Sequence, residues 1–153
     1  MGTRSTIGIL NDDGTVTSIY CHWDGYLDYN GRILTTYYTD EERVRELISL
    51  GSISSLGPKL NPSTDKHDFD SPEDDVVVAY HRDRGEDLHV DTDESEESFR
   101  VRNLDDVFQE YTYFFKREPD SSEKRWYVVD YYHEEFTLVT NELIKSEVGD
   151  EEE

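Results

Sequence analysis

The chain has 153 residues, enough for one domain, and a formal net charge of −22 from 37 Asp and Glu against 15 Lys and Arg. A charge of this sign argues against binding nucleic-acid phosphates through a basic face and against docking to an anionic membrane. It favours basic partners or cations, or solvation at high salt, and the single Cys excludes an internal disulfide.

The first two segments of the chain predict a β-hairpin. Residues 3–10 (TRSTIGIL) and 15–22 (TVTSIYCH) are rich in β-branched residues, and the NDDG between them is typical of a turn. Side chains alternate along a strand, so Ile19, Cys21 and Trp23 share the more apolar face. We expect this face to point to the core, with Trp23 packed under a helix.

Cys21 and His22 are neighbours in the second strand and therefore point to opposite faces. A nucleophile and its base must lie within hydrogen-bond reach, which adjacent strand residues do not achieve. We interpret Cys21 as a small buried hydrophobe, with a catalytic Cys as the alternative, and His22 as a surface residue or part of a binding surface. Asp24 and Gly25 are expected to form the turn that leaves the strand.

The clearest helix signal begins at Thr39. Thr39 at the N-cap and Glu42 three residues later form a capping-box pattern, and Gly51 follows the last apolar residue. The sequence therefore predicts a helix up to Gly51, preceded by one or two helical turns over residues 32–38.

The middle of the chain is polar and acidic. Residues 52–75 predict a long connection and residues 76–81 a buried strand, and residues 82–98 are expected to be a mobile acidic segment. Between positions 65 and 98 there are 14 acids and three bases. Half of the net charge of the chain therefore lies in this interval.

The last third predicts a short helix capped by Asn103 and a second hairpin from the aromatic runs 110–116 and 125–132, followed by a turn and a helix. These elements predict an α+β fold, with an antiparallel sheet of two hairpins plus a central strand and short helices packed on one face. We expect one domain over residues 1–148 and an acidic tail over 149–153.

Sequence motifs for catalysis or cofactor binding are missing: the chain has no Walker loop, no G-x-G-x-x-G, no H-E-x-x-H and no paired Cys. A metal site built from His67 with Asp68 and Asp70, or from His81 with Asp83, is an alternative to isolated surface residues. EF-hand spacing fails in both acidic segments. The prediction is that the chain uses no cofactor or metal. Whether it is an enzyme stays open, and binding to a protein partner is favoured over catalysis.

Five segments in a fixed order carry a resemblance: TRSTIGI, SIYCHWDGY, NGRIL, VRELISLGSISSLG and AYHRDRGE. They are similar to small uncharacterised bacteriophage and prophage proteins with a TRSTI-type first strand, a YxHWDGY-type motif and an SSLG segment. The resemblance covers residues 3–57 and, less closely, 76–87. It implies a phage context in the cytoplasm of an infected host cell and supplies no catalytic residue.

Acidity and phage context together predict an inhibitor of host defence. We expect the chain to bind a host complex of DNA- or RNA-handling proteins, of the anti-CRISPR or anti-restriction type, through its basic groove and by DNA mimicry. It is not expected to bind nucleic acid itself. The acids expected to make this contact are locally dense and are assigned to loops: Asp68, Asp70, Glu73, Asp74, Asp75, Asp91, Asp93, Glu94, Glu96 and Glu97.

Three alternatives stay open. The first is a small enzyme acting on a nucleotide signal, which requires His22, His81 and Asp24 or Asp83 to converge. The second is a sponge for such a ligand, which requires a local cluster of cations: Arg4, Arg32, Arg82 and Arg84. The third is a virion or replication accessory protein.

Overall fold

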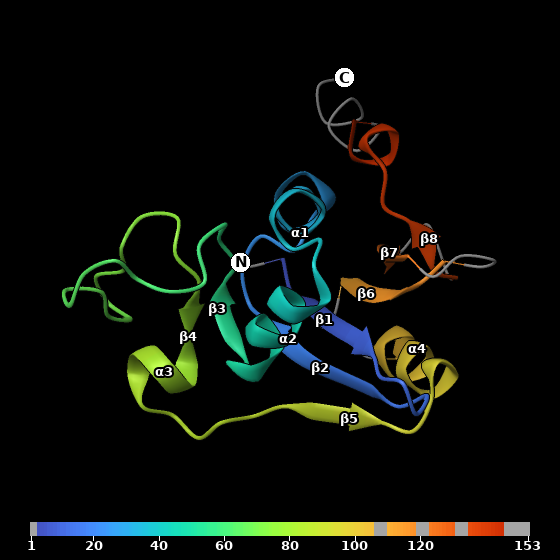
Figure 1. Cartoon of the computed structure of the whole chain (residues 1–153), viewed down its shortest axis with the longest axis horizontal. Helices are drawn as coiled ribbons and strands as arrows, with labels where there is room; N and C mark the ends of the chain where they lie inside the picture. Colours follow the sequence, from blue (N-terminus) through green and yellow to red (C-terminus); the bar gives the residue numbers. More distant parts are fainter. Residues whose placement is uncertain (1–2, 106–109, 119–122, 131–134, 146–153) are drawn as a thin grey trace.

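The computed structural model describes residues 3–105, 110–118, 123–130 and 135–145. An eight-stranded sheet runs through the molecule, which has the expected α+β architecture (Figure 1). The strands are β1 (Ser5–Leu10), β2 (Val16–Cys21), β3 (Ile53–Ser55), β4 (Val78–Ala79), β5 (Asp91–Asp93), β6 (Tyr111–Arg117), β7 (Lys124–Val129) and β8 (Thr137–Leu138). The helices are the π-helical turn η1 (Leu27–Gly31), α1 (Arg32–Tyr37), α2 (Glu41–Ser49), α3 (Tyr80–Arg84) and α4 (Glu96–Asp105), and residues 141–145 are also helical.

The sheet is mostly antiparallel, in the order β4-β3-β2-β1-β6-β7-β8 with β5 paired to β2. Strands β1 and β2 form one antiparallel pair and β6 and β7 form another. The two pairs are joined by a parallel ladder between β1 and β6, and β2 also runs parallel to β3. The sheet is therefore mixed rather than purely antiparallel. Parallel neighbours are far apart in sequence and leave no local turn signal, which is why the sequence did not reveal them.

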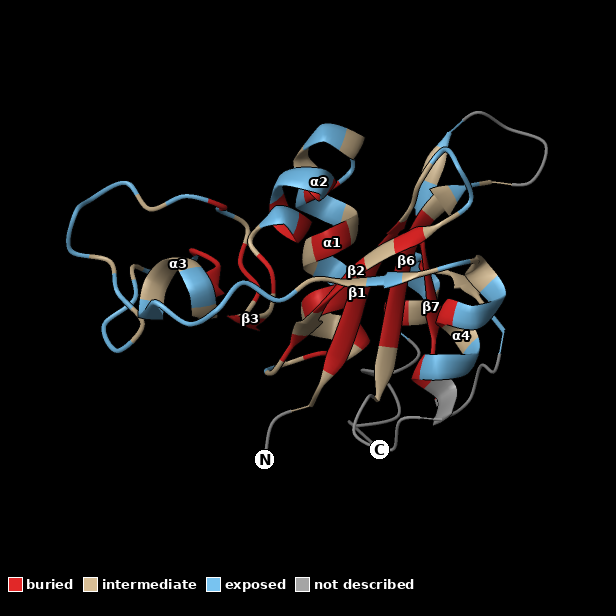
Figure 2. Cartoon of the chain, turned by 90° about the horizontal axis from the view of Figure 1, so that it is seen from below, coloured by how far each residue is buried: buried red, intermediate tan, exposed pale blue. Residues whose placement is uncertain are grey.

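One face of the sheet packs against α1 and α2. Ile7, Ile9 and Ile19 from β1 and β2 are fully buried there. Their partners across the layer are the apolar side chains of the two helices: Leu34, Val44, Leu47 and Ile48. This face is the main hydrophobic core, and most residues of the central strands are buried in Figure 2.

The opposite face is covered by α4, which corrects the expectation that the helices pack on one face only. Phe99 of α4 is fully buried in a smaller cluster with Val16 and Phe114. Gly8 makes this contact close, because a Cβ added there would lie 2.7 Å from the Phe99 ring. The alternation along β2 predicted only one apolar face, but Val16 on the other face is buried as well.

Two segments in the middle of the chain differ from expectation. Residues 76–81, expected as a central strand, supply only the two-residue edge strand β4 before the chain turns into α3. Residues 82–98, expected as a loop, contain β5 and the first turn of α4. Asn103 is accordingly buried inside α4, where its side-chain amide donates to the Phe99 carbonyl at 2.8 Å, and does not cap a later helix.

The start of α2 lies one residue later than predicted. Asp40 is the N-cap, and its carboxylate accepts a hydrogen bond from the Glu42 N–H at 3.4 Å. Thr39 therefore lies outside the helix. The end of α2 is as predicted, because Gly51 adopts a left-handed φ of 75° that a glycine accommodates without strain.

Candidate functional site

Cys21 is a structural residue. Its side chain is fully buried, and the Asn30 amide donates to its sulfur at 3.4 Å. Burial raises the pKa of the Cys21 thiol to about 11, against the smaller opposing effect of the Asn30 hydrogen bond. A neutral, inaccessible thiol is a poor nucleophile, so the first interpretation holds and the catalytic alternative does not.

Trp23 lies at the surface and not under a helix, which corrects the sequence prediction. It is 42% exposed, although its backbone N–H donates a hydrogen bond to the Ser54 carbonyl of β3. The chain turns sharply after it because Asp24 adopts a φ of 59° and Gly25 lies against β1. A Cβ on Gly25 would lie 2.8 Å from both the Ser5 Cβ and the Thr3 carbonyl. The predicted turn at positions 24 and 25 is therefore present, and it directs Trp23 outwards.

The exposed side of this motif carries a chain of hydrogen bonds. Arg4 Nε donates to the Tyr20 hydroxyl at 3.1 Å, and that hydroxyl lies 2.7 Å from His22 Nδ1. Desolvation and the Arg4 charge lower the pKa of His22, which favours its neutral form at pH 7. Among the described residues, no hydrogen bond or ion pair joins His22 to His81, whose Nδ1 contacts the Glu86 carbonyl. The convergence that the enzyme alternative requires is therefore not formed by these two histidines.

Residues 61–75 form a loop that projects from one end of the molecule (Figures 1 and 2). We call this segment the 61–75 loop. Its two ends meet at Arg82, whose guanidinium donates to the Leu60 and Val77 carbonyls, both at 2.6 Å. Lys59 and Val76 form a parallel bridge at the same place. The base of the loop is therefore closed by backbone contacts and one arginine.

A buried histidine and aspartate fix the body of the loop. The side chains of His67 and Asp83 are 1% and 5% exposed, and His67 Nε2 lies 3.1 Å from an Asp83 oxygen. His67 Nδ1 accepts the Glu73 N–H at 2.9 Å. Burial raises the pKa of Asp83, but hydrogen bonds from Arg82 and the Ala79 N–H outweigh it, so the net pKa is lowered. We refer to His67, Arg82 and Asp83 as the loop brace.

Glu73 organises the other side of the loop. Its carboxylate accepts hydrogen bonds from the Ser63 N–H, the Ser63 hydroxyl and the Thr64 hydroxyl, at 2.9 to 3.2 Å. The Ser63 backbone bond is the largest cause of the lowered pKa of Glu73. Asp68 likewise accepts the Ser71 N–H at 2.7 Å. These two predicted partner-binding acids therefore also shape the loop.

Asp70, Asp74 and Asp75 of the same loop are exposed. Within the described part of the chain, no salt bridge involves any of the three. The loop as a whole carries six acids and one Lys. It is therefore the part of the predicted acidic surface with the least compensation by cations.

The other predicted acids lie at the far end of the molecule, on residues 91–102, which we call the paired acidic region (Figure 1). The sequence assigned them to a loop, but Asp91 and Asp93 lie in β5 and Glu96 and Glu97 in α4, and only Glu94 lies in the bend between these elements. Arg102 contacts Asp93 at 2.8 Å and Asp91 at 4.0 Å. The remaining pairs are Arg100 with Glu97 at 2.6 Å and Lys116 with Glu96 at 2.9 Å, and only Glu94 is without such a pair among the described residues.

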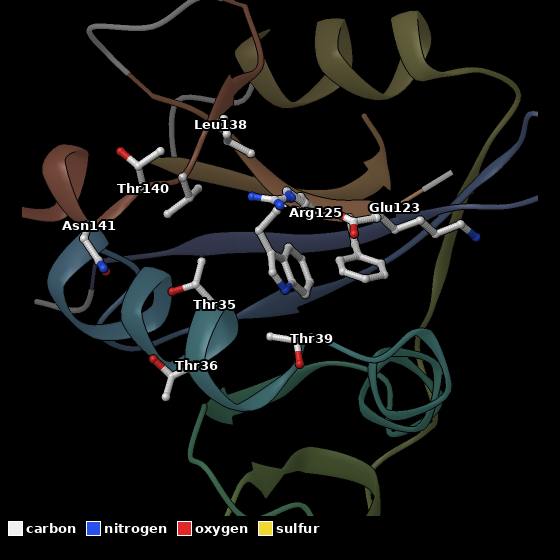
Figure 3. Close-up of a pocket in the computed structure, with 12 residues that line it drawn as sticks. Thr35, Thr36, Thr39, Glu123, Arg125, Leu138, Thr140 and Asn141 are labelled. Carbon is white, nitrogen blue, oxygen red and sulfur yellow. Dashed lines mark hydrogen bonds and ion pairs between the residues drawn. The ribbon is translucent and has the colours of Figure 1, made fainter. Parts of the chain in front are cut away.

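A cleft lies between α1, β7 and the segment 138–141, with a volume of about 860 Å³ (Figure 3). We call it the threonine cleft. Thr35, Thr36 and Thr39 line one wall, and Thr140 and Asn141 line another. The remaining lining residues are Phe115, Glu123, Lys124, Arg125, Trp126, Leu138 and Val139. This site was not predictable from the sequence, because its residues come from four separate segments and match no motif.

The four arginines that a phosphate sponge requires have separate partners. Arg32 of α1 pairs with Asp28 of η1, Arg82 with Asp83, and Arg84 with Glu86 at 3.2 Å. Arg4 contacts Tyr20 instead. Three of these arginines are therefore already paired with one carboxylate each.

Among the described residues, no group of three or more His, Cys, Asp or Glu side chains is arranged to hold a metal ion. In particular, His67 faces Asp83 rather than Asp68 or Asp70. Within the same residues, no helix has the length and apolar character needed to cross a bilayer. No protein-family model, no curated protein and no solved structure matches the chain.

Proposed function

We propose that the chain is a phage-encoded inhibitor that acts in the cytoplasm of the infected host cell. It binds the basic groove of a DNA- or RNA-handling defence complex and competes there with nucleic acid. The 61–75 loop makes the central contact. The observation that carries the proposal is the pairing of the acids. The loop projects with six acids and one Lys, whereas Arg or Lys side chains pair with four of the five acids of the paired acidic region.

The brace makes the loop suitable for this role. A flexible acidic segment loses conformational entropy when it is ordered on a partner, which weakens its binding. Here Arg82 closes the base of the loop and His67 is buried against Asp83. The backbone that carries Asp70, Asp74 and Asp75 is therefore already ordered before a partner binds. A net charge of −22 adds long-range attraction to a basic groove, which accelerates association in a salt-dependent way.

The test compares two matched charge variants. The loop variant changes Asp68, Asp70, Asp74 and Asp75 to Asn, and the control variant changes Asp93 to Asn and Glu94, Glu96 and Glu97 to Gln. Both remove four negative charges. Each chain is produced in bacteria that carry a CRISPR or restriction system, and the plating efficiency of a sensitive phage is measured. We expect the unmodified chain and the control to protect the phage, and the loop variant to protect it at least tenfold less.

Affinity capture from the same cells supplies the physical readout. A nucleic-acid-handling complex should be retained at about 50 mM salt and released at about 500 mM, because screening weakens exposed charge pairs. The loop variant should retain less of it than the control does. Equal loss in both variants would mean that total charge, and not the loop, is responsible. A lack of protection by the unmodified chain against every system tested would refute the inhibitor function.

A further inference from the structure

The threonine cleft has the size and lining of a small-molecule site. Its volume of about 860 Å³ lies within the range of about 300 to 1,000 Å³ typical of ligand pockets. Buried rings of Phe115 and Trp126 and the side chain of Leu138 supply apolar surface. Polar side chains surround this surface on two sides (Figure 3). Such a combination holds a ligand by shape and orients it with a few hydrogen bonds.

Three of the polar side chains are available to a ligand. Within the described part of the chain, no hydrogen bond engages the side chains of Thr36, Thr39 or Asn141. Thr39 is available because Asp40 takes the N-cap position of α2 in its place. Thr hydroxyls and the Asn amide both donate and accept hydrogen bonds, so they match groups on a ligand that do the same.

The charges at the cleft select against ionic ligands. Arg125 is held by Glu118 and Glu123, both at 3.2 Å, and Lys124 is paired with Glu41. An anion would have to displace these carboxylates and enter the field of a chain with a net charge of −22. A cation would approach Lys124 and Arg125, and the carboxylates beside them are already engaged in ion pairs. A neutral ligand meets neither obstacle.

We propose that the threonine cleft binds a neutral polyhydroxylated molecule of the size of a nucleoside or a disaccharide. The hydroxyl groups of the ligand exchange hydrogen bonds with Thr36, Thr39 and Asn141, and its less polar face rests on the apolar lining. This site lies on α1, β7 and the segment 138–141, apart from the 61–75 loop, so it does not depend on the inhibitor function.

The experiment titrates the full chain with adenosine, maltose and AMP, each up to about 10 mM, which covers weak sites. Amide NMR shifts of Thr36, Thr39 and Asn141 report the place of binding. Trp126 lines the cleft and Trp23 is remote from its lining, so fluorescence of a Trp23→Phe background reports the cleft alone. We expect saturable shifts with at least one neutral probe and at least threefold weaker binding of AMP than of adenosine.

Two variants complete the test. Thr36→Val with Thr39→Val keeps the side-chain shape and removes both hydroxyls, and binding should weaken roughly twofold to tenfold for each lost hydrogen bond. Thr92→Val on exposed β5 is the control and should leave binding unchanged. Binding of adenosine alone or of maltose alone identifies the ligand as a nucleoside or a saccharide. No saturable shift with either neutral probe, tighter binding of AMP, or equal affinity of the threonine variant would overturn the proposal.

Discussion

The 61–75 loop and the paired acidic region have a similar density of acidic residues and different surfaces. The loop carries six acids in fifteen residues, and the paired region carries five in twelve. In the paired region, Arg100 and Arg102 of α4 and Lys116 of β6 reach four of the five carboxylates. In the loop, the bonds to Asp68 and Glu73 come from neutral backbone and hydroxyl groups. A high density of Asp and Glu therefore gives an uncompensated negative surface only where folding brings no Arg or Lys side chain to these carboxylates.

The difference has a structural origin in the way each region is attached. Phe99 anchors α4 on the sheet, and this packing brings Arg102 beside Asp93 and Glu96 beside Lys116. The loop is attached through Arg82, which binds a carbonyl at its base, and through His67, which lies against buried Asp83. Its acids therefore remain on the outside. Substituting the residues that make each attachment therefore tests the comparison.

The largest effect is expected from Phe99→Ala. Phe99 is fully buried against Phe114, with ring centroids 5.1 Å apart, and truncation of such a residue costs about 3 to 5 kcal/mol of unfolding free energy. Urea unfolding measures this loss. Val101→Ala on the same helix is the control, because Val101 is 42% exposed and should cost less than about 1 kcal/mol. Similar losses from both changes would show that α4 is not anchored by Phe99.

A smaller effect is expected from Asp83→Ala in the loop brace. The change leaves Arg82 and His67 without their buried partner, and removing one member of a buried pair costs several kcal/mol. Because Arg82 is partly exposed, we expect about 2 to 3 kcal/mol. Hydrogen exchange should accelerate at the Glu73 and Ala79 amides, which this network engages. Asp74→Ala is the control and should change neither quantity measurably.

The same brace predicts an acid dependence. The pKa of Asp83 is lower in the folded chain than in the unfolded one, so its stabilising effect is fully present above the unfolded value of about 3.9. That effect is lost as the pH falls through the lower folded pKa. Unfolding free energy should therefore decline less steeply below about pH 4 in an Asp83→Asn variant than in the unmodified chain. Parallel declines in the two chains would show that Asp83 contributes no acid sensitivity.

Local sequence patterns predicted several strands of the sheet but not the contacts between strands that are distant in sequence. The β-branched runs and the NDDG turn predicted β1 and β2, and the aromatic runs predicted β6 and β7. The parallel contact between β1 and β6 was not predictable, because it joins Ser5 to Tyr111 across the intervening chain. Trp23 was assigned to the core by alternation, but β2 ends at Cys21 and the Trp23 ring is exposed.

For the candidate sites too, the sequence predicted local features and missed those that folding assembles. The acids of the 61–75 loop were predicted by their density, whereas the neutralisation of Asp93 and Glu96 was not, since their partners Arg102 and Lys116 are brought there by folding. The threonine cleft was not predicted either. Its walls come from α1, β7 and the segment 138–141, and isolated threonines in a sequence carry no signal for a pocket.

The smallest effect concerns the ion pairs of the paired acidic region. Two guanidinium nitrogens of Arg102 contact Asp93, at 2.8 and 2.9 Å, and the Asp93 side chain is only 10% exposed. Paired geometry of this kind is stronger than a typical surface ion pair, so Asp93→Asn should cost about 1 kcal/mol at low salt. Near 1 M salt the loss should shrink to about half, because screening weakens the pair.

Glu94→Gln gives the matched control, because Glu94 is exposed and no cation contacts it within the described residues. In a chain with a net charge of −22, removing an unpaired negative charge relieves repulsion, so this change should leave stability unaltered or raise it slightly. Opposite signs for two neighbouring acids would establish that pairing, and not acidity, distinguishes the two regions. Equal changes in unfolding free energy at both positions would contradict the pairing, and would make the two acidic regions equivalent as partner surfaces.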